Sequence, residues 1–408
     1  MITYEVRLKK IGEMTIVPDS QRLFGFLINY SKKYCTESEI SAFVKGVKEQ
    51  EQKCMISSVV PTGYYPTPKG YIMQKLQKRL KTNQKEIEKL ENKQRSSKKE
   101  AESIIRKLMK KNNQKNDLRI KQAKEEKKEL DKEIKCLKTK LNDVKNAFNN
   151  AVSETANLSE KNIYKTIRSM DFIEQNQLKK LLELDKIEEE IKVEDLVKIK
   201  HIKKTQTFIQ KFRLESQIKN LPGLPNVAYL LSIILFISQD KKTQYEFSFF
   251  VKVKQESCIT KALDGMKNDL NKNEMTCFLG GKGSTGYNEY HLYGIEKSND
   301  NKDEEQPIAS VNYLNMGVLL PNFDNIDVED SLLEISTSDR KPFEIENEIS
   351  KVISFVTAGS VIKVKDGGVD PYKIGESIDN SKYNPLYKKN AIIFGNSYLV
   401  ELEGHDEN

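Results

Sequence analysis

Alternating apolar and polar residues open the chain and predict a strand with one buried face over residues 2–9. After a loop, Asp19 or Ser20 is placed to cap a helix whose apolar positions continue to about residue 30. The same periodicities predict two further elements, a helix over 37–49 and a strand over 55–60. The N-terminal part therefore begins in the order strand, helix, strand.

From Ile72 the apolar period becomes helical. Apolar residues step alternately by four and three along a seam: Leu130, Ile134, Leu137, Leu141, Val144 and Phe148. This heptad spacing is typical of a coiled coil. A polar stretch at 111–117 interrupts the pattern and predicts the tip of an antiparallel helical hairpin. At 1.5 Å per residue each arm reaches roughly 50–60 Å.

The basic charge of the protein is concentrated in this predicted hairpin. The formal net charge is +8, and residues 72–150 contain 25 Lys and Arg against 12 Asp and Glu, which leaves the remainder at −5. Two interpretations stay open. The lysines keep a solvated coiled coil soluble, or the arm contacts nucleic acid or an acidic partner.

A second basic stretch, residues 198–213, is interleaved with aromatic residues. It contains Lys198, Lys200, His201, Lys203, Lys204, Phe208, Lys211, Phe212 and Arg213. In an extended segment this mixture suits RNA, whose phosphates pair with cations and whose bases stack on rings. The competing interpretation is an exposed basic hairpin without a ligand.

Leu221-Pro-Gly-Leu-Pro225 breaks the chain and predicts a domain boundary. The expected elements after it are a buried apolar element over 227–237, a strand over 245–253, a helix over 257–270 and strands over 311–321, 351–357, 361–365 and 392–402. Strand–helix–strand order on both sides of the break is part of a ferredoxin-like unit.

The most unusual stretch is glycine-rich and lies between two predicted strands. It contains Gly280, Gly281, Lys282, Gly283, Ser284, Thr285 and Gly286. Glycines permit positive φ and leave backbone N–H groups uncovered, which forms a seat for phosphate. Its spacing matches neither a Walker loop nor the dinucleotide-binding motif. A plain turn between two strands is the alternative.

Composition excludes several classes of protein. The five cysteines are scattered without a C-x-x-C pair, so neither a zinc site nor a disulfide framework is expected, and a reducing cytoplasm fits. The three histidines form no metal cluster by spacing. The N-terminus is not a signal peptide. The most apolar window, 227–237, is too short to cross a bilayer, so no membrane partner is expected.

Several segments, in order, resemble a known family. They are 19–25, Ser58-Val-Val-Pro-Thr-Gly-Tyr-Tyr-Pro-Thr-Pro-Lys69, Leu279-Gly-Gly-Lys-Gly-Ser-Thr-Gly-Tyr287, 318–321, Phe355-Val-Thr-Ala-Gly-Ser-Val361 and 384–391. The series resembles subunit four of the Csm complex, the type III-A CRISPR–Cas effector, within the repeat-associated RNA-binding superfamily. The resemblance covers roughly residues 1–71 and 160–408, and residues 72–159 look like an insertion.

The resemblance implies an α+β protein with two ferredoxin-like (RRM-like) domains and an inserted antiparallel coiled-coil hairpin. The expected domains are 1–71 plus 160–220, the insertion 72–159, and 221–408 with the glycine-rich loop. It further implies a non-catalytic, cytoplasmic, prokaryotic protein without a cofactor. Such a subunit holds the 5′ handle of the CRISPR RNA and docks on the large polymerase-like subunit and the backbone-forming Csm subunits.

Carried over by position, the implied RNA contacts form three groups. They are the glycine-rich loop Gly280–Gly286, the start of the first helix with Ser20 and Arg22, and a thumb-like hairpin with Lys200, His201, Lys203, Lys204, Phe208, Lys211 and Arg213. Phe208, Phe212 or Tyr287 supply candidate surfaces for base stacking. Two alternatives remain: an endoribonuclease of the same superfamily with His201 as general base, and a coiled-coil scaffold whose globular parts only dimerise.

Overall fold

The computed structural model describes most of the chain outside the lysine-rich insertion. The described residues are 1–74, 167–182, 196–207, 228–238, 241–299, 312–337, 353–365, 369–379 and 392–402, with the single positions 132, 135 and 139. The chain forms two compact units, one of residues 1–70, 169–182 and 194–408 and one of residues 71–168 and 183–193. All described strands belong to the first unit, which is α+β with antiparallel sheets.

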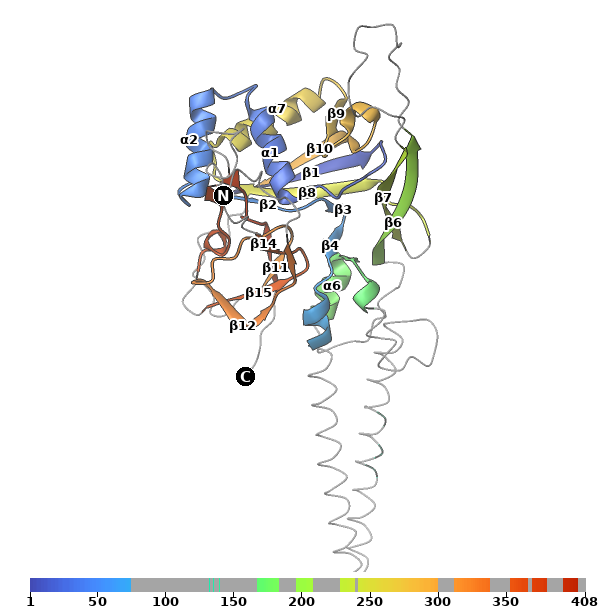
Figure 1. The fold of residues 1–408 in the computed structure, drawn as a ribbon. Helices are drawn as coiled ribbons and strands as arrows, with labels where there is room; N and C mark the ends of the chain where they lie inside the picture. Colours follow the sequence, from blue (N-terminus) through green and yellow to red (C-terminus); the bar gives the residue numbers. More distant parts are fainter. Residues whose placement is uncertain are drawn as a thin grey trace, which may run out of the picture. The chain divides into compact units, whose positions relative to one another are not determined.

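The largest sheet has the N-terminal strand at its centre (Figure 1). Its strands, in order across the sheet, are β2 (Cys54–Ile56), β8 (Glu246–Val253), β1 (Ile2–Lys10), β10 (Glu289–Asn299) and β9 (Met275–Phe278), and β3 (Val60–Pro61) also pairs with β8. The predicted alternation of β1 is confirmed, because Tyr4, Val6 and Leu8 are buried and Lys9 is exposed. Burial of this apolar register is what holds the strand in the middle of the sheet.

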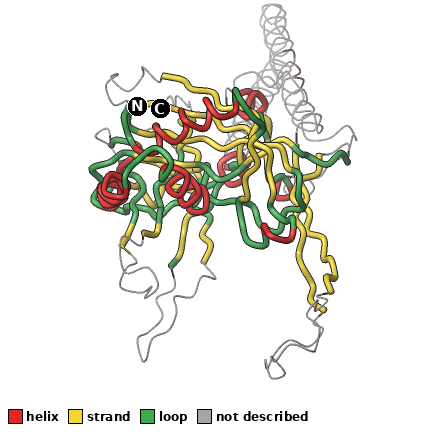
Figure 2. Tube along the Cα trace, turned by 90° about the horizontal axis from the view of Figure 1, so that it is seen from above, coloured by secondary structure: helices red, strands yellow, loops and turns green. Residues whose placement is uncertain are grey.

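Two helices connect these strands in the β-α-β-β-α-β order of the ferredoxin-like motif. α1 (Ser20–Ser31) lies between β1 and β2 in the sequence, and α7 (Cys258–Leu270) follows β8. Figures 1 and 2 show both helices, with α2 (Glu37–Lys48), on one face of the sheet. The motif is therefore assembled from two halves of the chain, residues 2–56 and 246–299.

The predicted division into two ferredoxin-like domains at residue 221 is not confirmed by this topology. The N-terminal and C-terminal strand–helix–strand runs are the two halves of one sheet, since β1 pairs with both β8 and β10. In the separated halves β1 and β8 each lose the strands on both of their sides, and pairing between the halves restores them. The predicted break at 221–225 itself lies outside the described residues.

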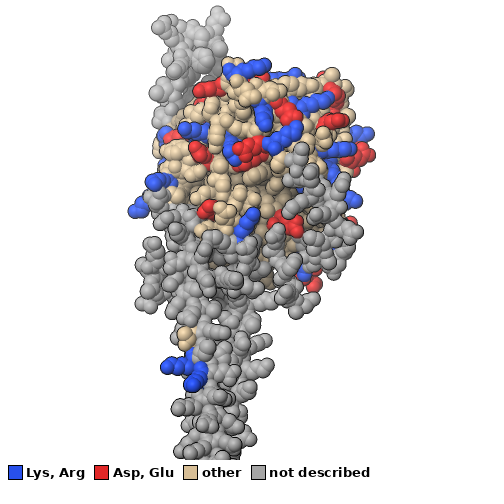
Figure 3. Space-filling view, turned by 180° about the vertical axis from the view of Figure 1, so that it is seen from behind, with Lys and Arg blue, Asp and Glu red and all other residues tan. Residues whose placement is uncertain are grey.

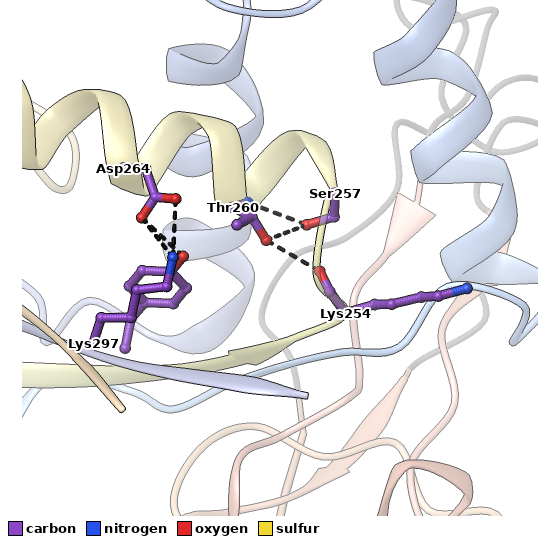
Figure 4. Close-up of polar contacts among 6 residues, drawn as sticks. Lys254, Ser257, Thr260, Asp264 and Lys297 are labelled. Carbon is purple, nitrogen blue, oxygen red and sulfur yellow. Dashed lines mark hydrogen bonds and ion pairs between the residues drawn. The ribbon is translucent and has the colours of Figure 1, made fainter. Parts of the chain in front are cut away.

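Polar side chains fix α7 on the sheet (Figure 4). The Ser257 hydroxyl caps the helix by accepting from the Thr260 N–H (3.1 Å), and the Thr260 hydroxyl donates to the Lys254 carbonyl (3.1 Å). One turn later, Asp264 accepts from the Tyr4 hydroxyl (3.0 Å) and from the Lys297 ammonium group (3.1 Å). The pKa of Tyr4 is raised, mainly because the hydroxyl is buried and to a lesser extent because it donates to Asp264. Strands β1 and β10 are thereby tied to the same turn of α7.

Residues 312–402 form a second sheet. Its strands, in order, are β12 (Ile326–Leu332), β15 (Val361–Val364), β11 (Asn312–Asn315) and β18 (Leu399–Leu402). Two pairs of short strands accompany it, β13 (Ile335–Thr337) with β14 (Ser354–Val356) and β16 (Ile378–Asp379) with β17 (Ile392–Ile393). Among the described residues of this region the only helical turn is η5 (Pro371–Lys373). The described residues from 312 to 402 do not by themselves form a second ferredoxin-like domain. They do have a core of their own, in which Leu319, Ile326 and Ile362 are fully buried.

The third sheet contains the basic stretch. Its strands, in order, are β4 (Tyr64–Pro66), β5 (Phe172–Glu174), β6 (Leu196–Thr207) and β7 (Ala228–Ser238), and α6 (Gln175–Leu182) follows β5. β6 and β7 form a long antiparallel ribbon (Figure 1), so the predicted extended basic segment is confirmed as far as Thr207. The sequence predicted a buried apolar element over 227–237. β7 is only partly buried, since Leu230 is 66% exposed. No described helix is both long and apolar enough to cross a membrane.

The second unit contains the insertion, and the structure describes only a few of its residues. Lys132, Lys135 and Thr139 are helical and exposed, and the Thr139 hydroxyl donates to the Lys135 carbonyl (2.8 Å), the spacing of one helical turn. All three lie off the predicted apolar seam. Residues 72–74, at the predicted start of the hairpin, are also helical, and the rest of it, including its tip, lies outside the described residues.

The shared sheet makes a prediction for a divided chain. Residues 1–220 and 221–408, produced separately, each lack cooperative thermal unfolding because β1 loses both neighbours in one fragment and β8 and β10 lose β1 in the other. Produced together, they copurify and regain a cooperative transition measured by circular dichroism. Cooperative unfolding of monomeric 1–220 by itself would contradict the shared sheet.

Candidate nucleic-acid interface

The glycine-rich stretch is the turn of a β-hairpin. β9 ends at Phe278, which pairs with Glu289 at the start of β10, and the Leu279 N–H donates to the Asn288 carbonyl (3.0 Å). Inside the turn, Gly280 and Gly286 have positive φ of 156° and 80°. The predicted need for positive φ is thus confirmed at these two glycines, and so is the interpretation as a turn between strands. Phosphate binding stays a prediction.

The buried side chain of Asn288 holds this turn in place through hydrogen bonds. This residue is fully buried with a φ of 55°, a left-handed conformation that asparagine tolerates better than most residues. Its side-chain oxygen accepts from the Thr15 N–H (2.8 Å), and its side-chain nitrogen donates to the Thr15 hydroxyl (2.8 Å) and the Gly281 carbonyl (2.7 Å). The Asn288 N–H donates to the Glu13 carbonyl (2.9 Å). The turn is thereby bonded to the segment after β1.

That segment, residues 11–15, approaches the turn closely. The N–H groups of Ile11 and Gly12 both donate to the Glu289 carbonyl, at 3.0 and 3.1 Å. A Cβ atom at Gly12 would clash with the carbonyl oxygen of Gly286, so only glycine leaves room for this approach. Segment 11–15 and the glycine-rich turn therefore behave as one packed structure.

Part of the turn is exposed to solvent and offers hydrogen-bond donors. Gly281, Lys282 and Ser284 are exposed. Within the described part of the chain, the N–H groups of Gly281, Gly283 and Ser284 have no hydrogen-bond acceptor. Adjacent uncovered N–H groups form a concavity suited to an anion. The Thr285 hydroxyl is engaged, because it donates to the Lys282 carbonyl (2.8 Å).

The basic ribbon is joined to the same segment 11–15. The Ile234 N–H of β7 donates to the Met14 carbonyl (2.7 Å). The Lys204 ammonium group of β6 pairs with the Glu13 carboxylate at 2.8 Å, and this bond raises the pKa of Lys204. Residues 13 and 14 thus bond to the glycine-rich turn on one side and to the ribbon on the other.

A direct contact completes the junction. The Tyr287 hydroxyl donates to the side-chain oxygen of Gln206 on β6 (2.6 Å). Tyr287 is only 7% exposed, which removes it as the base-stacking surface considered from the sequence. Its role in the structure is to link the hairpin turn to the ribbon.

The ribbon presents cations to solvent. Lys200, His201 and Lys203 are exposed, and the structure shows no ion pair for Lys200 or Lys203 among the residues it describes. Elsewhere the charges are mixed, as Figure 3 shows for one face, where positive and negative side chains are interspersed. On that face the cations do not gather into a patch, whereas the described part of the ribbon presents several of them to solvent.

The remaining predicted contacts have other surroundings. Ser20 is fully buried, and its hydroxyl accepts from the Val318 N–H (3.1 Å) and donates to the Val318 carbonyl (3.3 Å). These bonds join α1 to the segment after β11, and an RNA contact of Ser20 stays a prediction. Arg22 forms an ion pair with Asp19, the residue that caps α1. Phe208, Lys211, Phe212 and Arg213 lie outside the described residues.

Sequence reasoning missed Asn288, Thr15 and Glu13. Each is a common polar residue without a motif of its own. The one available signal was an asparagine two residues after the last glycine of the turn, where a left-handed residue is often required. Their importance follows from contacts across more than 270 positions of sequence, which local pattern does not reveal.

Replacing Asn288 tests the anchoring of the turn. Asn288→Ala removes three side-chain hydrogen bonds at a fully buried site, so we expect the free energy of unfolding to fall by about 2–4 kcal/mol. Urea denaturation measures it. Asn271→Ala, at the exposed end of α7, is the matched control and changes stability by less than about 0.5 kcal/mol. Equal stability of the two variants would contradict the anchoring.

Comparison with known proteins gives a remote structural likeness. No family model matches the sequence, and the search of curated proteins gives no match. Among solved structures, the chain aligns with the Csm1–Csm4 cassette in complex with cA4, with pppApA and with AMPPNP, each at 12% identity. These alignments cover 99%, 100% and 99% of both chains, with TM-scores of 0.42, 0.43 and 0.43. The name of the cassette refers to Csm proteins, and the sequence resembles subunit four of the Csm complex.

Proposed function

We propose that this chain is a non-catalytic, guide-RNA-binding subunit of a type III-A CRISPR effector, in the position of subunit four of the Csm complex. In this role it holds the 5′ handle of the CRISPR RNA during antiviral defence. One observation carries the proposal: residues 13 and 14 join the glycine-rich turn to the basic ribbon. The two elements that the sequence resemblance assigns to the RNA thereby form one surface.

The chemistry of this surface suits a single-stranded RNA backbone. Exposed N–H groups of the turn and the Lys282 side chain are donors for phosphate oxygens. Lys200 and Lys203 add positive charge on the two faces of the ribbon. Contacts of this kind set the position and register of a bound strand. The rigid turn meets the strand without reordering, which lowers the entropic cost of binding.

The surroundings of His201 favour holding RNA over cutting it. His201 is exposed and pairs across the ribbon with the apolar Ile234. No hydrogen-bond partner orients its imidazole among the described residues. A general base needs a defined position relative to the proton it removes. The endoribonuclease alternative therefore lacks structural support at this histidine.

The second sheet offers a surface for protein partners of opposite charge. Asp324, Asp327, Glu329, Asp330 and Glu334 crowd β12 and the turns beside it, and acidic residues outnumber basic ones in the described residues from 312 to 402. Phe323, Val328 and Ile335 are exposed among them. In our proposal this surface docks on a basic region of the large polymerase-like subunit, because complementary charge guides such encounters. Backbone-forming Csm subunits complete the assembly.

Charge reversal in the turn tests the RNA contact. Lys282→Glu places a carboxylate beside the expected phosphate, so affinity for a handle-bearing RNA falls on the order of tenfold at moderate salt. The slope of log affinity against log salt becomes shallower by about one. Fluorescence anisotropy over a salt titration measures both effects.

Lys254→Glu is the matched control, because Lys254 follows β8 beside the start of β1, whereas the turn contacts the segment after the end of β1. We expect this variant to bind RNA as the wild type does. Equal affinity of Lys282→Glu and wild type at every salt concentration would remove the turn from the interface. Cleavage of repeat RNA that His201→Ala abolishes would overturn the non-catalytic assignment.

A further inference from the structure

An aromatic ring stands at the edge of the glycine-rich turn. Phe278 is the last residue of β9, the edge strand of the central sheet. Its neighbours Cys277 and Leu279 are buried, at 5% and 2% exposure, whereas Phe278 is 49% exposed. Because side chains alternate along a strand, Phe278 lies on the sheet face opposite the helices. The fold therefore leaves half of a phenyl ring in solvent, without covering it as it covers both neighbours.

The turn itself holds this ring in place. A Cβ atom at Gly283 would lie 3.0 Å from Cδ1 and 3.1 Å from Cγ of Phe278. Gly283 has no positive φ, so close packing on the ring, and not backbone conformation, explains why glycine occupies this position. The backbone of the turn thus supports one part of the ring and leaves the rest open.

The exposed donors of the turn belong to the same few residues. The N–H groups of Gly281, Gly283 and Ser284 lie in the short turn that packs on the ring. A nucleotide carries a phosphate, which such donors bind, and a base, which stacks on an aromatic face. Ring and donors together form a subsite of matching chemistry, whereas a purely apolar contact would leave the donors unpaired.

We propose that Phe278 is the stacking platform for one unpaired base of the bound RNA, with a neighbouring phosphate on the N–H groups of the turn. The inference rests on the proposed RNA-binding function and deepens it. A base inside a duplex already stacks on its neighbours through both faces, so neither face is available to the ring. Phe278 therefore selects single-stranded RNA, and purines, with their larger rings, stack on it better than pyrimidines.

An abasic scan tests this platform in the full-length protein. A labelled, handle-bearing single-stranded RNA is compared with a series that lacks one base at a time. With wild-type protein, one abasic position lowers affinity by between about fivefold and a hundredfold. Phe278→Leu, which keeps apolar volume but removes the aromatic face, lowers affinity for intact RNA by the same factor. For this variant the abasic position has no further effect, and Phe278→Trp restores binding.

Two controls separate stacking from a general effect. Tyr34→Leu changes an exposed aromatic residue just after α1, at 37% exposure, and leaves RNA affinity unchanged. With 2-aminopurine at the sensitive position, fluorescence is quenched on binding to wild type and less so on binding to Phe278→Leu.

The outcomes distinguish this inference from the proposed function. If wild-type protein does not bind the RNA, the proposed function fails and the platform with it. If Lys282→Glu weakens binding while Phe278→Leu binds normally, the RNA interface stands and the platform is overturned. A Phe278→Leu variant with normal RNA affinity but impaired assembly with protein partners assigns the ring to a protein contact and equally overturns the inference.

Discussion

The hydrogen bonds between residues 13–15 and Asn288 are the constraint on which the interface depends. Asn288 is buried in a left-handed conformation and bonds to Thr15 through both atoms of its side-chain amide. Partners for buried polar groups are obligatory, because an unpaired amide costs about 1–3 kcal/mol. The turn therefore has one low-energy position relative to segment 11–15. Since Met14 also bonds to Ile234, the basic ribbon shares that position.

The central strand explains why this constraint is effective. Segment 11–15 follows β1 directly, and β1 is held on both sides by β8 and β10. β10 also carries the glycine-rich turn at its start. One buried strand thus positions both the glycine-rich turn and the basic ribbon, through hydrogen bonds of the segment that directly follows it. Rigid placement of donors and cations on regular elements is what a binding site for an extended strand requires.

Local features of this protein were readable from its sequence, and long-range pairings were not. Period-two alternation predicted β1, a capping residue predicted the start of α1, the helical spacing of apolar residues predicted α7, and the glycines predicted the turn. The joining of residues 2–10 with 246–253 was missed, because both halves show the same strand–helix–strand order and pattern does not tell which strands pair. The burial of Ser20 was missed for a related reason, since a serine at a helix start looks the same in the sequence whether it is exposed or bonded to Val318.

The central claim is that the turn and the ribbon form one RNA-binding surface. Photo-crosslinking tests this claim most directly. A handle-bearing RNA substituted with 5-iodouridine is irradiated with the full-length protein, and the modified peptides are identified by mass spectrometry. The account predicts crosslinks from one RNA to both the turn, residues 279–287, and the ribbon, residues 196–207. Crosslinks confined to the second sheet or to the inserted segment, with none at the turn or ribbon, would contradict it.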